Sequence, residues 1–325
     1  MGGGSRVGQY KRRFLKGEKV REEGEKESHV IASFRRGGYE VHEAEGGGYE
    51  LINEGVFTGV FSEARVEKHR ILFKLSHGMN LEISDRGAKE ILREGKAELC
   101  GLLASDGTIY EYMVCPRDRS PFIQRQVSLS SMDHEVIEIY KDLFEDIYGF
   151  EPHEYVLRRR TKKGESEEYH AVTYRRAVYY DLENLGIKGP EPYEFHPPIE
   201  HLDDEGKKAY LRGFFTGDGC VHIGKDEKRH EIRISSSYKE GLEEIRDMLE
   251  DLGFHVGEIH EHHRKSDERI EYSIYIPEED HLKFIEEIGS ERKEHIRKFE
   301  RIREIDEEKK GGGKKSEGCY CLELG

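Results

Sequence analysis

The chain of 325 residues contains no tryptophan, eight prolines and five cysteines. The cysteines are odd in number and lack paired spacings, so they predict no disulfide framework and favour a reducing compartment. No run of about 18 apolar residues occurs, and no apolar segment follows the basic N-terminus. We therefore expect neither a membrane helix nor a secretory signal, and a cytoplasmic, nucleoid-associated location.

The charge balance is strongly acidic. Charged residues make up 37% of the chain, and the formal net charge is −15. This balance argues against indiscriminate binding to nucleic acid. It does not exclude a specific DNA site, because attraction to phosphates depends on local basic strips.

A duplicated unit dominates the sequence. ELCGLLASDGTIY (Glu98–Tyr110) and YLRGFFTGDGCVH (Tyr210–His222) share Leu-x-Gly, two apolar residues, two small residues and Asp-Gly. Two downstream segments match in register as well, Val127–Phe150 with Ile232–Phe254 and Glu167–Ile187 with Arg269–Gly289. Periodicity and turn signals predict the order αββαββα for each copy.

These features predict an α+β protein of four parts. An N-terminal β-rich region occupies residues 1–94, and the two repeats occupy residues 95–198 and 199–303. A linker and a C-terminal strand follow at residues 304–325. The first hairpin of each repeat is expected at Thr108–Val114 with Phe122–Leu129, and at Val221–Gly224 with His230–Ser235.

Small residues recur at positions i and i+4 of both motifs, Gly101 with Ser105 and Gly213 with Gly217. On a helix such positions share one face and let another backbone approach closely. Glycine inside a helix costs roughly 0.5–1 kcal/mol relative to alanine. We therefore predict that the two motif helices pack on each other through these faces.

The same packing would bring Asp106 and Asp218 together at the helix ends. Two carboxylates there repel each other and face the negative ends of the helix dipoles. A divalent cation removes both problems, and oxygen ligands at a partly open site suit Mg²⁺. For one motif alone, a plain helix stop at an Asp-Gly turn is the better explanation. The duplication favours a metal site.

LCGLLASDG and LRGFFTGDG resemble the signature motifs of the LAGLIDADG homing endonucleases in their single-chain, two-motif form, over about Gly95 to Arg303. The resemblance implies a monomer with pseudo-two-fold symmetry, whose two curved sheets form a saddle on double-stranded DNA. It also implies hydrolysis of both strands at a long site with Mg²⁺, for which Mn²⁺ can substitute. The implied metal ligands are Asp106, Asp218, Gly107 and Gly219.

Two lysines match the family as well. LGIKGPEPYEFHPP places Lys188 where relatives often have an active-site lysine, and IGSERKEHIRKF places Lys293 similarly in the second copy. Such a lysine would steady the hydrolytic water or the charge that develops on the phosphate. The alternative for each is a solvated surface lysine.

Strand alternation assigns side chains to the outer, polar faces of the two sheets. Arg125 is expected to point inward, whereas Gln124 and Gln126 point outward, as do Arg229, Glu231 and Arg233 in the second copy. Gln and Arg pair bidentately with base edges, and basic loops bind phosphates. The predicted DNA contacts are Gln124, Gln126, Arg158, Arg160, Lys162, Lys163, Arg175, Arg229, Arg233 and Arg264. The alternative is exposed charge balanced by nearby glutamates.

A histidine-rich segment raises the alternative of a transition-metal site. It contains His255, His260, His262 and His263. No cysteine lies near, and adjacent histidines on a strand point to opposite sides. We interpret the segment as a DNA-facing hairpin.

The terminal segments resemble an intein splicing domain, over Gly48–Ser84 and in the strand EGCYCLELG. Position 1 is neither Cys nor Ser, Ile83–Arg86 lacks the expected histidine, and the chain ends without His-Asn. We therefore predict no splicing and a degenerate intein-like β-domain that aids DNA binding. The alternative is an unrelated small β-rich domain.

The leading functional prediction is a metal-dependent, site-specific DNA endonuclease. A non-catalytic DNA-binding regulator on the same fold would be expected to lose one or both of Asp106 and Asp218, and this chain keeps both. An intron RNA maturase, with RNA as a partner, stays open beside cleavage.

Overall fold

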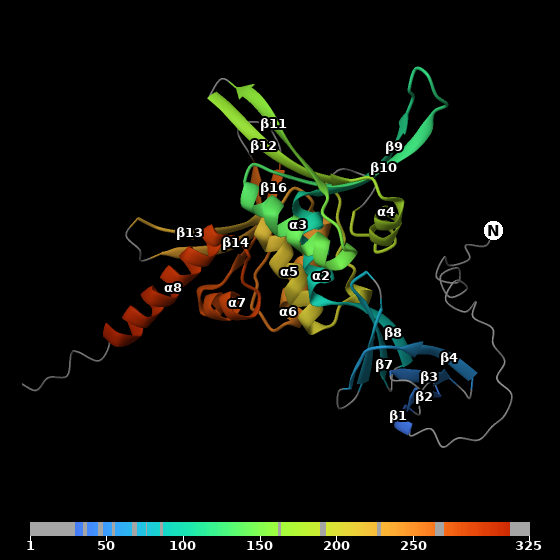
Figure 1. Ribbon diagram of the computed structural model, residues 1–325. Helices are drawn as coiled ribbons and strands as arrows, with labels where there is room; N and C mark the ends of the chain where they lie inside the picture. Colours follow the sequence, from blue (N-terminus) through green and yellow to red (C-terminus); the bar gives the residue numbers. More distant parts are fainter. Residues whose placement is uncertain are drawn as a thin grey trace, which may run out of the picture. The chain divides into compact units, whose positions relative to one another are not determined.

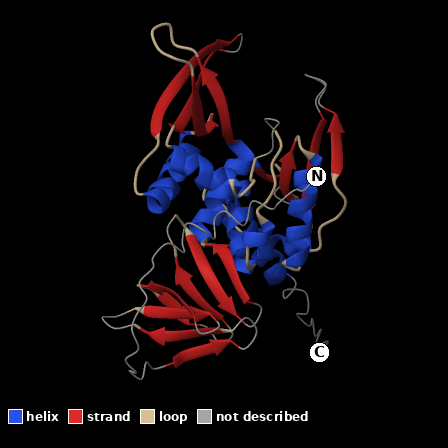
Figure 2. Ribbon diagram, turned by 90° about the vertical axis from the view of Figure 1, so that its right-hand side faces the viewer, coloured by secondary structure: helices blue, strands red, loops and turns tan. Residues whose placement is uncertain are grey.

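The computed structural model describes residues 30–34, 38–44, 48–53, 56–66, 70–75, 77–84, 87–161, 164–188, 193–225, 229–263 and 270–312. The chain divides into two compact units, Met1–Ile91 and Leu92–Gly325. Within the described residues, the first unit is built from strands alone, whereas the second combines helices and strands (Figure 2). No helix in the described ranges is long and apolar enough to cross a membrane.

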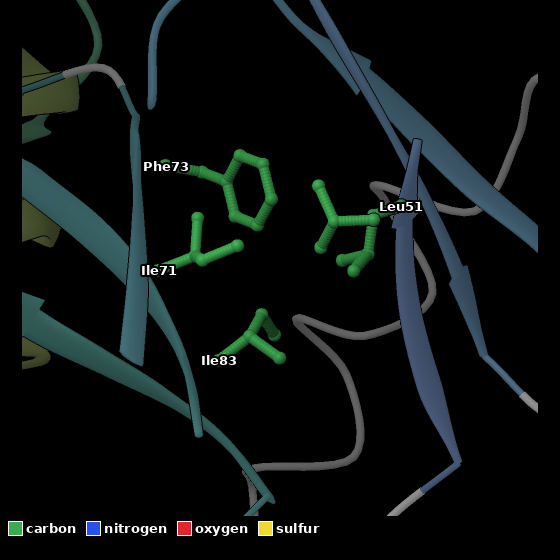
Figure 3. Packing of buried hydrophobic residues seen from close by; sticks show 5 residues of the cluster. Leu51, Ile71, Phe73 and Ile83 are labelled. Carbon is green, nitrogen blue, oxygen red and sulfur yellow. The ribbon is translucent and has the colours of Figure 1, made fainter. Parts of the chain in front are cut away.

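The first unit contains two four-stranded sheets. One has the order β1-β2-β3-β4, formed by Val30–Phe34, Tyr39–Glu43, Tyr49–Asn53 and Val56–Phe61. The other has the order β5-β6-β7-β8, formed by Ala64–Val66, Arg70–Lys74, Met79–Ser84 and Gly87–Leu92. Val41 and Leu51 pack against Ile71, Phe73 and Ile83 in one apolar core between the sheets (Figure 3). Each sheet thus covers the apolar face of the other.

The N-terminal region is therefore β-rich, as expected. The C-terminal strand of the intein-like prediction, Glu317–Gly325, lies outside the described residues. The intein-like origin stays a prediction.

The second unit contains the order αββαββα twice, which confirms the predicted fold class. The first copy comprises α2 (Glu94–Asp106), β9 (Gly107–Val114), β10 (Phe122–Ser131), α3 (His134–Tyr148), β11 (His153–Thr161), β12 (Gly164–Thr173) and α4 (Arg176–Glu183). The second comprises α5 (Asp204–Asp218), β13 (Gly219–Ile223), β14 (His230–Ser236), α6 (Lys239–Asp251), β15 (His260–His263), β16 (Ile270–Ile276) and α7 (His281–Glu287). A further helix, α8 (Lys293–Gly312), follows.

The two sheets of this unit share one connectivity, with orders β11-β12-β10-β9 and β13-β14-β16-β15. Their inner faces are apolar and packed on helices, as fully buried Val127, Leu129, Ile232 and Ile234 show. The alternation along each strand leaves the opposite face polar and outward. The α3 helix stops at Gly149, whose φ of 72° is the left-handed conformation typical of a helix C-cap.

The motif helices α2 and α5 lie side by side at the centre of the unit (Figure 1). A Cβ atom placed on Gly101 would lie 2.0 Å from the carbonyl oxygen of Tyr210. A Cβ atom placed on Gly213 would lie 2.0 Å from the carbonyl oxygen of Glu98. The two backbones touch at these points, so no side chain fits there.

We expect Gly213→Ala to destabilise the protein by about 1–3 kcal/mol, because its methyl group forces the two helices apart. Urea denaturation measures the change. Gly95→Ala is the control, since a Cβ atom there meets nothing within 4 Å. An equal effect of the two substitutions would contradict the close approach.

Candidate functional site

Asp106 and Asp218 are the last residues of α2 and α5. The helix ends meet, because a Cβ atom placed on Gly217 would lie 2.0 Å from Ser105 Oγ and 3.1 Å from Asp106 Oδ2. The Asp106 carboxylate therefore lies against the residue that precedes Asp218. Gly107 and Gly219 begin strands β9 and β13, so each chain turns into its sheet directly after its carboxylate.

Lys188 lies beside these two carboxylates. Its Nζ donates to the carbonyl oxygen of Ala104 at 2.8 Å, in the last turn of α2. Burial lowers the pKa of Lys188 to about 8, against the opposing attraction of Asp218 and Asp106. One partly buried lysine thus faces the acids of both repeats.

The donor set suits a hard divalent cation. Burial raises the pKa of Asp106 to about 6, although Lys188 and Arg292 act in the opposite direction. The positive charge of the surrounding side chains therefore does not offset the burial of this carboxylate. Oxygen atoms of Asp106 and Asp218, with the backbone of Gly107 and Gly219 beside them, are the groups that could hold Mg²⁺ or Mn²⁺.

The second copy contributes Arg292, which the sequence interpretation passed over in favour of its neighbour. Arg292 acts electrostatically on Asp106, and its Nη2 donates to Asp133 Oδ2 at 2.9 Å. The Lys293 side chain is 75% exposed, with its Nζ 3.3 Å from Glu135 Oε1. A signal existed in the sequence. Lys188 follows the helix-ending Gly186 by two positions, and Arg292 follows the equivalent Gly289 by three.

The interface beneath the acids contains a second ionic contact. Arg212 of α5 lies with its Nη1 3.3 Å from Glu98 Oε2 of α2, and its Nε donates to the carbonyl oxygen of Ile288. Glu98 is almost fully buried, and burial raises its pKa to about 7, with Arg212 opposing the shift. This pair joins the two repeats directly.

The outer face of the first sheet carries Gln124 and Gln126 on β10. They stand opposite Tyr112 and Tyr110 of β9, in alternation with buried Val127. Arg125 points to the helix side as expected, 3.2 Å from Glu111 and over the ring of Tyr180. The exposed tyrosines were not singled out in the sequence, although Tyr110 and Tyr112 have the spacing of a strand face.

The arginines of β11 are all paired across the β11–β12 hairpin. Arg158, Arg159 and Arg160 reach Glu167, Glu168 and Glu165 at 2.9, 2.8 and 3.2 Å. These arginine side chains remain 63–86% exposed. Exposed pairs of this kind contribute little to stability and can exchange partners.

The other predicted DNA contacts are distributed differently. Arg175 lies over the ring of Phe150 at 3.4 Å from its centroid, and Arg233 lies 5.9 Å from that of Tyr275. Arg229 lines a hollow of about 530 Å³ at the β13–β14 turn, away from Asp106 and Asp218. Lys162, Lys163 and Arg264 lie outside the described residues.

The described part of the chain offers no second well-suited metal centre. His260, His262 and His263 lie on the exposed strand β15, and His262 Nε2 lies 3.2 Å from Tyr275 Oη. His134, Glu138 and Glu154 form a cluster of three potential ligands. Lys141 Nζ donates to both glutamates of this cluster, at 3.3 and 3.0 Å, and so already supplies its positive charge.

Residues 205–289 match the family of LAGLIDADG-like domains, which confirms for the second repeat the family indicated by the motifs. A stretch of 175 residues is 21% identical to the replication factor C small subunit of Methanocaldococcus jannaschii, over 54% of this chain and 9% of that protein. Another match, 23% over 175 residues, is to the ribonucleoside-diphosphate reductase NrdEB subunit alpha of Bacillus subtilis, over 53% of this chain and 15% of that protein. The chain thus spans less than a sixth of either relative.

Among solved structures, the chain is similar to I-DmoI in complex with DNA and Mn. The identity is 18% and the TM-score 0.41, over 61% of this chain and 98% of that one.

The Glu98–Arg212 pair predicts a pH dependence of stability. The pKa of Glu98 is raised from 4.5 to about 7 in the folded protein, so the folded state keeps a proton that the unfolded chain has lost. The contribution of Glu98 to stability therefore falls as pH rises from 4.5 to 7. We expect Glu98→Gln to gain about 3 kcal/mol relative to the wild type across this range.

Urea denaturation at several pH values measures this difference. Glu145→Gln, an exposed acid on α3, serves as the control. A difference between Glu98→Gln and the wild type that does not change with pH would contradict the assignment.

Proposed function

We propose that this chain, a LAGLIDADG protein through its second repeat, is a metal-dependent endonuclease that hydrolyses double-stranded DNA at a specific long site. The observation that carries the proposal is the convergence of two aspartates at the adjoining C-terminal ends of α2 and α5, beside one partly buried lysine. Asp106 lies against Gly217, and Lys188 is attracted to both Asp106 and Asp218. A plain pair of helix stops requires no such convergence.

The roles follow from the chemistry of the groups. A bound divalent cation would stabilise the attacking and leaving oxygens of a phosphodiester. Asp106 and Asp218 would hold it between the two repeats. Lys188, held by the carbonyl oxygen of Ala104, would orient the attacking water or stabilise charge on the phosphate. Arg292 would supply a permanent positive charge on the Asp106 side.

The sheets would position the duplex. Strands β9 and β13 begin directly after the two carboxylates, so their outer faces extend from the cleavage site in both directions. DNA cut between Asp106 and Asp218 would therefore run along these faces. A two-stranded ribbon fits the major groove, and outward Gln and Arg side chains can pair with base edges there.

The curated relatives support a unit that is carried within unrelated proteins. The two relatives have unrelated names, and each match spans 175 residues and leaves most of the relative uncovered. An endonuclease inserted into a host protein would give this pattern. It agrees with the intein-like interpretation of the N-terminal unit.

We expect the wild type with Mg²⁺ to convert members of a randomised plasmid library into discrete linear products. Asp106→Asn and Asp218→Asn should each abolish linear product, because each removes an anionic metal ligand. Asp247→Asn, on the exposed face of α6, is the control and should cut like the wild type. Binding without cutting by the wild type would instead indicate a DNA-binding regulator.

The basic residues give a separate prediction. Lys188→Met should slow cleavage by about 10²–10³-fold, the effect of losing one donor to a transition-state charge. Arg292→Met should slow it more than Lys293→Met, because Arg292 acts on Asp106 and Lys293 pairs with Glu135. Single-turnover rates on a selected site measure all three. A larger loss of rate in Lys293→Met than in Arg292→Met would show that Lys293 is the counterpart of Lys188 in the second repeat.

A further inference from the structure

Four tyrosines gather on the outer face of the first sheet. Tyr110 and Tyr112 lie on β9, Tyr155 on β11, and Tyr174 directly follows β12. Their exposed fractions are 41, 38, 39 and 49%. We refer to these four residues as the tyrosine cluster.

The cluster is a continuous surface. The rings of Tyr110 and Tyr112 stack with centroids 5.3 Å apart. Burial raises the pKa of Tyr174, and the same shift includes contributions from Tyr112, Tyr155 and Tyr110. The four phenols are therefore close enough to act on one another. A contiguous exposed aromatic surface of this kind indicates a binding partner.

The described residues of the second sheet present a different outer face, on which Tyr275 lies beside His260 and His262. In the repeat alignment, Ile232 and Ile234 correspond to Val127 and Leu129. The registers then place His222 at the position of Tyr110 and His260 at that of Tyr155. The same duplicated sheet thus presents two chemically different faces.

The ring geometry distinguishes two kinds of nucleic acid partner. Platforms for single-stranded nucleic acid offer open ring faces on which bases stack. Here Tyr110 and Tyr112 stack on each other, and Tyr155 stacks on His170 at 4.8 Å with an interplanar angle of 2°. One face of each of these three tyrosine rings is covered within the protein, and side-chain hydrogen bonds join Tyr110 to Gln126 and Tyr174 to Tyr112. Rings that are already stacked on a neighbour offer less to an incoming base, and their apolar edges suit the floor of a duplex groove.

The groove offers one apolar group that such edges can contact. Thymine alone presents a methyl group in the major groove, and a glutamine amide pairs best with adenine. Gln126 stands opposite Tyr110, and Gln124 opposite Tyr112. The face therefore combines apolar ring edges, which can contact a thymine methyl group, with glutamine amides, which can pair with the adenine of the same A·T base pair.

From this combination we infer that the tyrosine cluster reads thymine methyl groups in the DNA half-site beneath the first sheet. The half-site beneath the second sheet is read by a different set of side chains, which does not include this cluster. The inference rests on the proposed endonuclease function. It adds a substrate preference to that function, with one half-site specified by methyl contacts and the other not.

Replacing thymine with uracil tests this inference, because only the methyl group is removed. A site cut by the wild type is first selected from a randomised duplex pool. Each dT of one half-site is then replaced by dU, and kcat/KM is measured. We expect a loss of about three- to fivefold per effective methyl group in one half-site and little change in the other.

Variants assign the effect to the cluster. Tyr110→Ala and Tyr112→Ala should abolish the discrimination between dT and dU, whereas Tyr110→Phe should keep it. His222→Ala, at the matching position of the second sheet, should also keep it. Because Tyr110 and Tyr112 are exposed, these variants should fold, and their melting temperatures check this.

Efficient cleavage with no effect of dU in either half-site would overturn the inference and leave the nuclease intact. A dU effect that survives Tyr110→Ala and Tyr112→Ala would overturn it too. If these variants weaken binding of U-rich single-stranded RNA and leave DNA cleavage unchanged, the cluster is an RNA surface instead. A pool in which no site is cut would overturn the proposed function itself.

Discussion

The second unit depends on the contact between the backbones of α2 and α5. The sites of Gly101 and Gly213 each leave room for a hydrogen atom only, with a carbonyl oxygen of the other helix 2.0 Å from where a Cβ atom would lie. This approach fixes the two helices along their length. Their C-terminal ends, their carboxylates and the strands that start there are positioned as a consequence. A site shared by two halves of one chain requires such a rigid axis.

The duplication is symmetric in its backbone and asymmetric in its side chains. Both copies share strand order and helix positions. The interface itself differs, because Glu98 meets Arg212 while the equivalents of these residues are Tyr210 and Cys100. The basic residues differ as well, with Lys188 on one side and Arg292 on the other. One axis thus supports two halves with unequal side chains, as the proposed recognition of an asymmetric DNA sequence would require.

Much of this arrangement follows from the sequence, because the repeat supplies each prediction twice. The helix ends at Gly149 and Gly253, the hairpins, and the order αββαββα are local patterns that two copies reinforce. The position of Arg292 is not local. It depends on a one-residue difference in the loops after Gly186 and Gly289, which alignment of the motifs alone does not resolve.

One buried polar network in the first copy gave no signal in the sequence. Lys96 has the pattern of a surface residue, yet it is fully buried and pairs with Asp181, which also accepts from Tyr148. This network joins α2, α3 and α4, and only the three-dimensional arrangement brings its members together. The tyrosine cluster is similar in part, since only the fold brings Tyr155 and Tyr174 to the pair formed by Tyr110 and Tyr112 on β9.

Diffraction from crystals grown with Mn²⁺ and recorded at the manganese absorption edge tests the central claim most directly. The account predicts an anomalous peak at the adjoining C-terminal ends of α2 and α5, with carboxylate oxygens of both Asp106 and Asp218 as ligands. Manganese bound elsewhere, or bound by one aspartate with the other turned away, would contradict it.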